Sequence, residues 1–420
     1  MSNIQSMFQT IKEEAIRFDS YDDLDAIVEA IVEAKYVLLG EASHGTSEFY
    51  TVRAELSKKL MKEKGFSFIA VEGDWPSCFS VNRYVKGYDK KSARDALKDF
   101  NRWPTWMWAN EEVLSFIQWI KDYNQTSGKN VGFYGIDVYS LWESMEEAVR
   151  LLETKGAKEA EAARKAFSCF EPHNGRAENY GIHAAFYGED CIDEVMKLLI
   201  KIRENRHDYQ DDYETSLNLE INALVAVNAE RYYRSMVQGG PDDWNIRDHH
   251  MVSALEQIMA YYGTGAKAIV WEHNTHIGDA RATDMKKEGL VNVGQILRER
   301  AGKTNVFALG FGTHRGSVLA ARKWGEAMET MAVPPAEKGS WEDLMHQTGE
   351  FNKILFFSER NRKIFNDPIG HRAIGVVYHP EYEHLGNYVP SIMSERYDGF
   401  IHIEQTTALK PIAAGEVTVD

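Results

Sequence analysis

The sequence is poor in cysteine and has no long apolar run. Its 420 residues include three cysteines, Cys78, Cys169 and Cys191. Their number is odd and no pair is spaced as Cys-x-x-Cys, which gives no cysteine ligand set for a metal and indicates a reducing compartment. The stretch MSNIQSMFQTIKEEA has no apolar core typical of a secretion signal, and no later run approaches membrane-spanning length. We therefore expect a cytoplasmic protein without a membrane span.

Several catalytic motifs are also missing. The sequence contains no Gly-x-Ser-x-Gly nucleophile elbow, no His-Glu-x-x-His and no P-loop, which leaves covalent serine hydrolysis and thermolysin-type zinc chemistry unsupported. Acidic residues outnumber basic ones, 64 against 48, and the formal net charge is -16. This balance argues against a nucleic acid or an anionic membrane as the partner.

Apolar residues are abundant enough for a large core, at 44% of the chain with 12% aromatics. Short apolar runs typical of buried strands alternate with segments of helical periodicity, which predicts an α/β fold with a mostly parallel central sheet flanked by helices. The expected strands are residues 36–39, 66–71, 131–134, 267–271, 305–310, 354–357, 374–378 and 400–403.

The strand signal disappears between residues 141 and 262, where long helical patterns take over. We therefore expect three parts. Residues 1–140 form the first part of the α/β core and carry the active-site strand ends. Residues 141–262 form a helical insertion or cap over the active-site cleft, and residues 263–420 complete the core.

Glu41 and His44 directly follow a buried strand. The apolar run at residues 36–39 stops at Gly40, and Gly45-Thr46-Ser47 predicts the start of a helix. A carboxylate and an imidazole on a short turn at the carboxyl end of a strand lie where open α/β sheets bind their ligands. We expect the active site here.

Arg53 interrupts an apolar helical stripe. An unpaired buried charge is too costly, so Arg53 either reaches solvent or meets a carboxylate, with Glu41 and Glu72 as the candidates. Glu72 ends the strand at residues 66–71 and has no capping role, which favours a functional one. Asp74 precedes a helical pattern and is expected to be its N-cap.

His273 and His276 follow the expected strand at residues 267–271. Paired histidines at the same sheet edge as Glu41 and His44 favour a functional role over a structural one. The later run from residue 310 to 317, GFGTHRGS, only approximates a dinucleotide fingerprint, so we expect a glycine-rich loop bordering the site and no phosphate binding.

Trp103, Trp106 and Trp108 gather around one proline, and such rings are either core packing or the lining of a pocket for a bulky apolar ligand. Two charged segments of the helical part leave a similar choice, namely a solvated face or a lining that reaches the substrate. These segments contain Arg231, Tyr232, Arg247 and Asp248.

The candidate site thus combines imidazoles, carboxylates and an arginine. An imidazole oriented by a carboxylate can take a proton from water while neighbouring cations stabilise the developing oxyanion. The same groups could bind a divalent metal such as zinc or manganese, with Glu41, His44, His273 and His276 as ligands. Both alternatives are open on the residues alone, as is a non-catalytic binding module.

The segment GEASHG at residues 40–45, with Arg53, Glu72 and the run WEHNTH at residues 271–276, resembles the erythromycin esterase family. The resemblance covers nearly the whole chain. It implies an α/β core with a helical portion over a cleft, and hydrolysis of a macrolide lactone or other ester by water without a cofactor. It assigns His44 as the general base.

The same resemblance assigns roles to five other residues. Glu41 and Glu72 would be acids that orient the base, Arg53 would support them, and the further site residues would be His273 and His276. The implied partner is a small molecule such as a macrolide. The pocket candidates Trp103, Trp106, Arg231, Tyr232, Arg247 and Asp248 would then contact this substrate. Glu272 adds a carboxylate beside the histidines, which keeps the metal alternative open. No oligomeric state is predicted.

Overall fold

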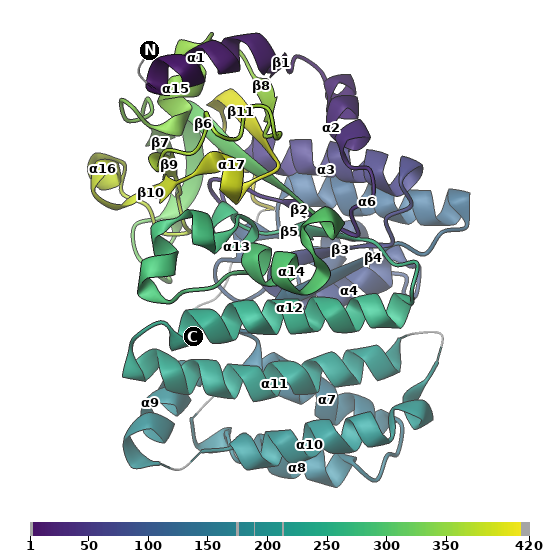
Figure 1. The fold of residues 1–420 in the computed structure, drawn as a ribbon. Helices are drawn as coiled ribbons and strands as arrows, with labels where there is room; N and C mark the ends of the chain where they lie inside the picture. The colour runs from purple at the N-terminus through teal and green to yellow at the C-terminus, as the bar shows by residue number, and fades with distance from the viewer. Residues whose placement is uncertain (1–2, 174–175, 189, 212–213, 413–420) are drawn as a thin grey trace. The chain divides into compact units, whose positions relative to one another are not determined.

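A computed structural model describes residues 3–173, 176–188, 190–211 and 214–412 of the chain. The chain divides into two compact units. The first comprises Met1–Ile69, Lys91–Val131 and Lys267–Asp420, and the second comprises Ala70–Lys90 and Gly132–Ala266. The predicted class is confirmed, because the protein is α/β with a mostly parallel sheet flanked by helices (Figure 1).

Parallel strands form the centre of the first unit. β2 (Tyr36–Leu39) lies between β5 (Ala268–Trp271) and β6 (Val306–Ala321) and is parallel to both. β11 (Gly399–Thr406) pairs with β6 on the other side, also in parallel. Runs such as YVLL and AIVW are almost completely buried, as expected for parallel strands covered on both faces.

Antiparallel strands extend this sheet. β8 pairs with β11, β1 pairs with β8, and β7 pairs with β6, while β9 and β10 form a separate hairpin-like pair. Their bounds are β1 Ile16–Arg17, β7 Met328–Val333, β8 Lys353–Phe356, β9 Ile369–Arg372 and β10 Tyr388–Ser391.

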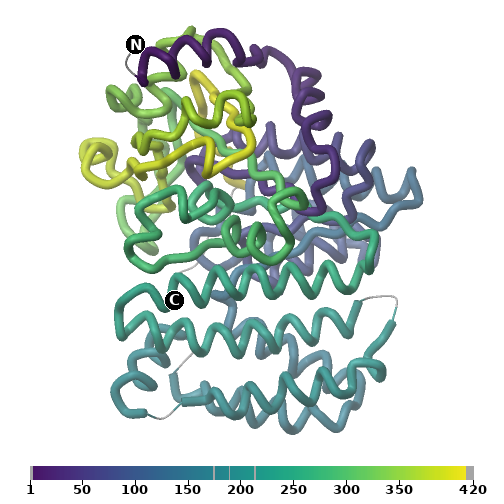
Figure 2. Tube along the Cα trace, in the orientation of Figure 1, coloured from purple at the N-terminus to yellow at the C-terminus, as the bar shows by residue number. Residues whose placement is uncertain are grey.

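Helices complete the first unit, and their ends follow the local sequence. Asn110 accepts a hydrogen bond from Val113 N at the start of α6, and Gly128 ends the helix in the left-handed region at φ 68°. Figure 2 follows the N-terminal helix α1 to its place beside α15, far along the chain. The helices are α1 Asn3–Glu14, α2 Asp25–Ala30, α3 Ser47–Glu63, α5 Ala93–Leu97, α6 Glu111–Ser127, α13 Asn274–Ile277, α14 Val293–Ala301, α15 Trp341–Gln347, α16 Glu383–Gly386 and α17 Met393–Arg396.

The second unit is mainly helical. The long helix α11 packs against α7, α9, α10 and α12, while α4 packs against β4. All elements that the structure describes between residues 141 and 262 are helical, in agreement with the periodicity of the sequence. The bounds are β3 Phe68–Asp74, α4 Trp75–Val85, β4 Gly132–Asp137, α7 Leu141–Thr154, α8 Ala160–Ser168, α9 Ala177–Tyr187, α10 Ile192–Glu204, α11 Thr215–Gln238 and α12 Asp242–Tyr262.

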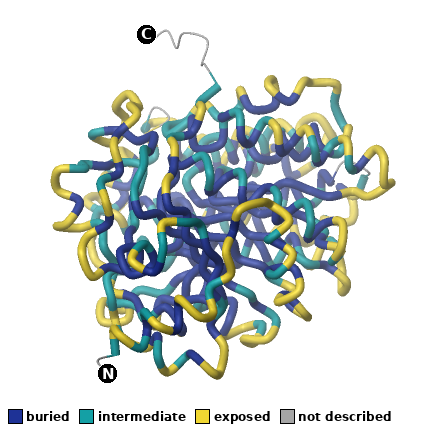
Figure 3. Tube along the Cα trace, turned by 90° about the horizontal axis from the view of Figure 1, so that it is seen from above, coloured by how far each residue is buried: buried dark blue, intermediate teal, exposed yellow. Residues whose placement is uncertain are grey.

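Buried residues follow the strands and the inner helix faces, whereas exposed residues gather on loops (Figure 3). Asp74 is the N-cap residue of α4, as predicted, and Ser340 caps α15 by accepting a hydrogen bond from Asp343 N. Within the described part of the chain, no helix has both the length and the apolar character that crossing a membrane requires.

Two predicted elements are wrong. The run at residues 310–317 is no loop, because β6 continues through it to Ala321. Its glycines serve close packing, since a Cβ at Gly310 or Gly312 would lie 2.6 Å from the ring of Tyr397 or Phe400. Residues 374–378 form no strand either and make only isolated bridges, to Ser43 and Ala321.

Two of the cysteines, taken as reduced in the sequence analysis, form a disulfide. Cys169 follows α8 and Cys191 precedes α10, and their sulfurs are bonded with the Cα atoms 6.0 Å apart. The sequence separation of 22 hides this pairing from spacing arguments, because it is helix packing that brings the two cysteines together. Cys78 is a free, buried thiol whose pKa is raised by burial.

The disulfide is expected to stabilise the helical unit. Closing a loop of this size removes chain entropy from the unfolded state, and Cys191→Ser should lower the free energy of unfolding by about 3 kcal/mol. Urea denaturation followed by circular dichroism measures this loss. Reductant should destabilise the wild type to the level of the variant and leave the variant unchanged; a wild type indifferent to reductant would contradict the prediction.

Candidate active site

The turn between β2 and α3 packs closely against β6. Gly45 permits this contact, because a Cβ at this position would lie 1.8 Å from the carbonyl oxygen of Leu319. The backbone N–H of Leu319 donates to the carbonyl of Gly45 at 2.9 Å. The close approach therefore fixes the backbone directly after His44.

A hydrogen-bonded chain of three side chains runs from α3 to this turn. Glu41 accepts a hydrogen bond from His44 Nδ1 at 2.8 Å through Oε1, and its Oε2 accepts from Arg53 Nη2. The guanidinium of Arg53 is fully buried and lies 4.6 Å from the ring centres of Tyr50 and Trp271. Glu41 is thus a partner of Arg53, as the sequence analysis allowed.

This arrangement sets the chemistry of His44. When Nδ1 donates its proton to Glu41, the basic lone pair of the imidazole lies on Nε2. A carboxylate that holds the ring in this tautomer also stabilises the imidazolium formed after proton uptake. The chain from Arg53 to His44 can therefore support general-base catalysis.

His273 lies next to His44, with the two ring centres 5.0 Å apart. The neighbouring strands β2 and β5 end side by side, and Asn274 N donates to the carbonyl oxygen of Glu41 at 2.9 Å. His273 Nδ1 accepts a hydrogen bond from the backbone N–H of Thr275, which favours a proton on Nε2. His273 can therefore donate a hydrogen bond to a substrate oxygen.

His276 is buried in the short helix α13, which begins at Asn274. The side chain of Asn274 anchors this helix through hydrogen bonds. Asn274 Oδ1 accepts from Phe311 N at 3.2 Å, while its Nδ2 donates to Phe311 O at 2.7 Å and to His371 Nε2 at 3.2 Å. His371 Nδ1 in turn contacts Glu342 Oε1 at 2.6 Å. Burial lowers the pKa of His371, which keeps its imidazole neutral.

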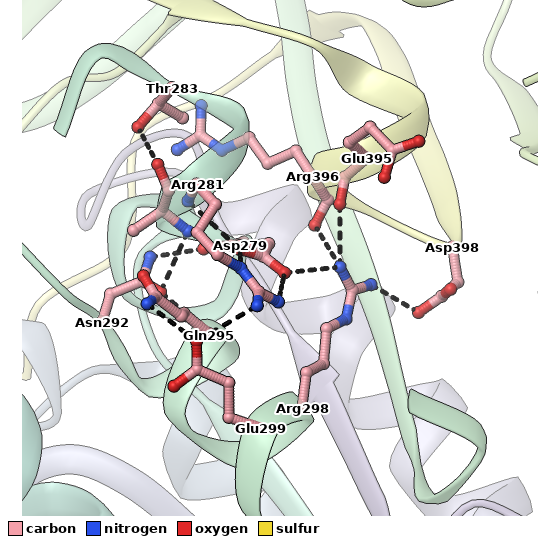
Figure 4. A network of polar contacts seen from close by, with 12 residues as sticks. Asp279, Arg281, Thr283, Asn292, Gln295, Arg298, Glu299, Glu395, Arg396 and Asp398 are labelled. Carbon is pink, nitrogen blue, oxygen red and sulfur yellow. Dashed lines mark hydrogen bonds and ion pairs between the residues drawn. The ribbon is translucent and has the colours of Figure 1, made fainter. Parts of the chain in front are cut away.

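The chain after His276 is held by a second polar network (Figure 4). Arg298 joins Asp279 to Asp398 and donates to the carbonyl oxygen of Glu395 at 2.8 Å. Asn292 Nδ2 donates to the carbonyl oxygen of Thr275 at 2.7 Å. These contacts hold the segment that carries the two histidines against α14, α17 and the residue that precedes β11.

Glu72, in the second unit, is paired with an arginine. Arg247 Nη2, on α12, lies 2.7 Å from Glu72 Oε1 and 2.8 Å from Asp137 Oδ2, and its Nε donates to Asp137 Oδ1 at 2.9 Å. Burial works to raise the pKa of Asp137, but Arg247 outweighs it and the pKa is lowered. The guanidinium also lies over the ring of Tyr139 at 4.8 Å.

The remaining substrate-contact candidates differ in exposure. Trp106 is buried, and Trp103 is partly exposed, donates to the carbonyl of Glu326 and packs on Trp324. Arg231 is exposed on α11, whereas Tyr232 is partly buried with its ring edge-on to Tyr139 at 5.3 Å. Asp248 is fully buried on α12.

Several residues that form hydrogen bonds around the candidate site residues were not predicted from the sequence. Asp137 is not among the predicted site residues, although an acid just past the expected strand at residues 131–134 is a visible signal. Glu342 and His371 were missed altogether, because each lies alone in its segment with no motif around it. Only the fold brings them to Asn274.

Comparisons with known proteins agree on the family. A sequence model of the Erythromycin esterase family matches residues 61–406. Erythromycin esterase type II from Escherichia coli is 21% identical over 413 residues, covering 93% of this chain and 94% of the relative. The matched region exceeds half of the chain by a wide margin.

Solved structures share the fold. A protein from Bacillus cereus superposes with a TM-score of 0.83 at 16% identity, covering 98% of this chain and 100% of that chain. A His-to-Asn mutant of erythromycin esterase EreC in its open conformation superposes with a TM-score of 0.64 at 16% identity, covering 96% of both chains. The resemblance noted in the sequence is thereby confirmed: this chain belongs to the erythromycin esterase family.

Proposed function

We propose that this chain is a hydrolase that cleaves an ester or lactone with a water molecule activated by His44. The hydrogen-bonded chain Arg53–Glu41–His44 supports this proposal most strongly. It combines a buried positive charge, an orienting carboxylate and an imidazole, which are the parts that general-base catalysis needs. Family membership supports hydrolase activity in general.

In the proposed reaction, His44 Nε2 takes a proton from water as the water oxygen attacks the carbonyl carbon. Nε2–H of His273 stabilises the resulting oxyanion, and His276 completes this side of the site. The tetrahedral intermediate then collapses and breaks the bond to the alcohol oxygen, which receives the proton from His44. The products are a carboxylic acid and an alcohol, so atoms and protons balance.

In the second unit, Glu72 is proposed as a site residue that Arg247 orients, with Asp137 holding the arginine in place. The other proposed contacts are Trp103, Trp106, Arg231, Tyr232 and Asp248. A macrolide lactone is the proposed substrate class, because two curated relatives are named erythromycin esterases. The reaction as proposed uses no metal or other cofactor.

A panel of macrolides and simple esters tests the proposal by mass spectrometry. We expect a mass gain of one water for at least one lactone, with activity that survives a chelator. Loss of activity with the chelator, restored by zinc or manganese, would instead favour a metal bound by Glu41, His44, His273 and His276. A ligand-induced rise in melting temperature without any product would favour a binding module.

A further inference from the structure

Three side chains outside the proposed active site converge in the first unit. A ring nitrogen from His314, one from His346 and a carboxylate oxygen of Glu404 all lie within 4.8 Å of one another. His314 is on β6, His346 is in the last turn of α15, and Glu404 is on β11. None of them takes part in the hydrolysis proposed above.

The pairing of β6 with β11 brings two of these side chains together. β6 and β11 run in parallel with Thr313 beside Ile403 and Arg315 beside Gln405, so His314 and Glu404 occupy neighbouring positions between these pairs. Side chains at neighbouring positions of adjacent strands project from the same face. α15 packs on both strands and brings His346 to that face.

The carboxylate is held between two imidazoles. His346 Nδ1 lies 2.7 Å from Glu404 Oε1, and His402 Nε2 lies 3.2 Å from Glu404 Oε2. Burial works to raise the pKa of Glu404, but the hydrogen bonds with His402 and His346 lower it on balance. The oxygen on the His346 side therefore belongs to an ionised carboxylate whose orientation is fixed.

His314 is buried, and one of its ring nitrogens has no hydrogen-bond partner in the described part of the chain. The residue is 5% exposed, yet its Nδ1 makes no hydrogen bond among the described residues. A buried polar nitrogen without a partner costs free energy comparable to a lost hydrogen bond. Burial and the neighbouring His346 lower the pKa of His314 to about 4, which keeps its imidazole neutral as ligation requires.

We propose that His314, His346 and Glu404 bind one divalent transition-metal ion, with Zn²⁺ as the best match. Two imidazole nitrogens and one carboxylate oxygen form a ligand set that suits zinc and leaves a position for water. His402 holds the other carboxylate oxygen, the kind of outer contact that orients metal ligands. The ion would tie α15 to β6 and β11.

Binding requires two adjustments. A nitrogen of His346 that coordinates the ion cannot also donate to Glu404, so Nδ1 must give up this contact if it is the ligand. The rings of His314 and His346 are parallel and stacked, with centres 3.7 Å apart, and lone pairs in parallel planes do not converge on one ion. The side chain of His346 is 23% exposed and its terminal torsion is soft, so this ring can tilt. Its exposure also gives the ion a route of entry.

Two nearby cations are turned toward other acceptors. The ammonium group of Lys353 donates to the carbonyl oxygens of Met345 and Gly349 and to the hydroxyl of Thr348. Arg372 Nη1 donates to the carbonyl oxygens of Thr313 and His314. Neither donor group competes for the ligand atoms, although both charges limit the affinity.

The experiment uses the full chain, stripped of metal by a chelator and dialysed. Zn²⁺ is titrated by calorimetry, and Co²⁺ is added as a spectroscopic probe of tetrahedral nitrogen and oxygen ligation. We expect one Zn²⁺ per chain, and His346→Ala and Glu404→Gln should each weaken binding by about tenfold or more. Zn²⁺ should also raise the melting temperature of the wild type but not of these variants.

His379→Ala is the matched control, because this partly exposed histidine also lies near a carboxylate, with Nδ1 3.9 Å from Glu381. It should bind Zn²⁺ like the wild type, and so should His44→Asn. Glu404→Gln keeps the shape of the side chain, so the test stands if His346→Ala fails to fold. A wild type that binds no Zn²⁺, or binding lost in His44→Asn but kept in Glu404→Gln, would overturn the proposal.

Discussion

Replacing His44 by asparagine is expected to lower kcat by about 10²- to 10⁴-fold, the range that general-base catalysis supplies. The amide of asparagine can still donate a hydrogen bond to Glu41, so the buried carboxylate keeps this partner. It cannot accept a proton from water at neutral pH. The defect should therefore appear in kcat on the best ester of the panel, with KM nearly unchanged and the melting temperature close to that of the wild type.

His379→Asn is the control for this variant, because it makes the same substitution at a partly exposed histidine outside the proposed site and should leave kcat unchanged. If His44→Asn retains full activity on every ester that the wild type cleaves, His44 is not the base.

Arg53→Met is expected to cause the largest loss of stability, about 3–5 kcal/mol, because it removes one partner of a buried ion pair. Glu41 is 1% exposed and would lose the guanidinium that balances its charge. The carboxylate must then take up a proton or draw in water, and either change weakens its hold on His44. Both the free energy of unfolding, from urea denaturation, and kcat should fall.

The double variant Arg53→Met with Glu41→Gln separates the two effects. It removes both charges, so a large part of the lost stability should return, because a neutral amide is less costly to bury than an unpaired carboxylate. Activity should stay low, since no carboxylate remains to stabilise the imidazolium of His44. A single variant as stable as the wild type would show that the ion pair contributes nothing to the fold.

The sequence was most informative where apolar runs were short and uninterrupted. The strand at residues 36–39 has the predicted bounds, and Asp74 is the N-cap residue of α4, as predicted. These elements are specified locally, by side-chain periodicity and by residues such as Asn110 that cap helix ends. Glycine misled the prediction at residues 310–317, because it marks both turns and close packing against rings.

The candidate site was predictable only in part. Glu41 and His44 are three residues apart on one turn, so their contact is local, and Arg53 required a buried partner of opposite charge. In contrast, His371 reaches Asn274 across 97 residues of sequence, and Cys169 pairs with Cys191 through helix packing. Such contacts arise from tertiary structure and leave no spacing pattern in a single sequence.

The uninterrupted course of β6 sets a constraint on evolution. Three of its residues contact different parts of the molecule. Phe311 accepts a hydrogen bond from Asn274, His314 belongs to the proposed metal site, and Leu319 donates a hydrogen bond to the turn after His44. Because side chains alternate between the two faces of a strand, the loss or gain of a single residue between Phe311 and Leu319 would invert every side chain beyond it. Relatives that keep these contacts should vary in the composition of this stretch but hold its length constant.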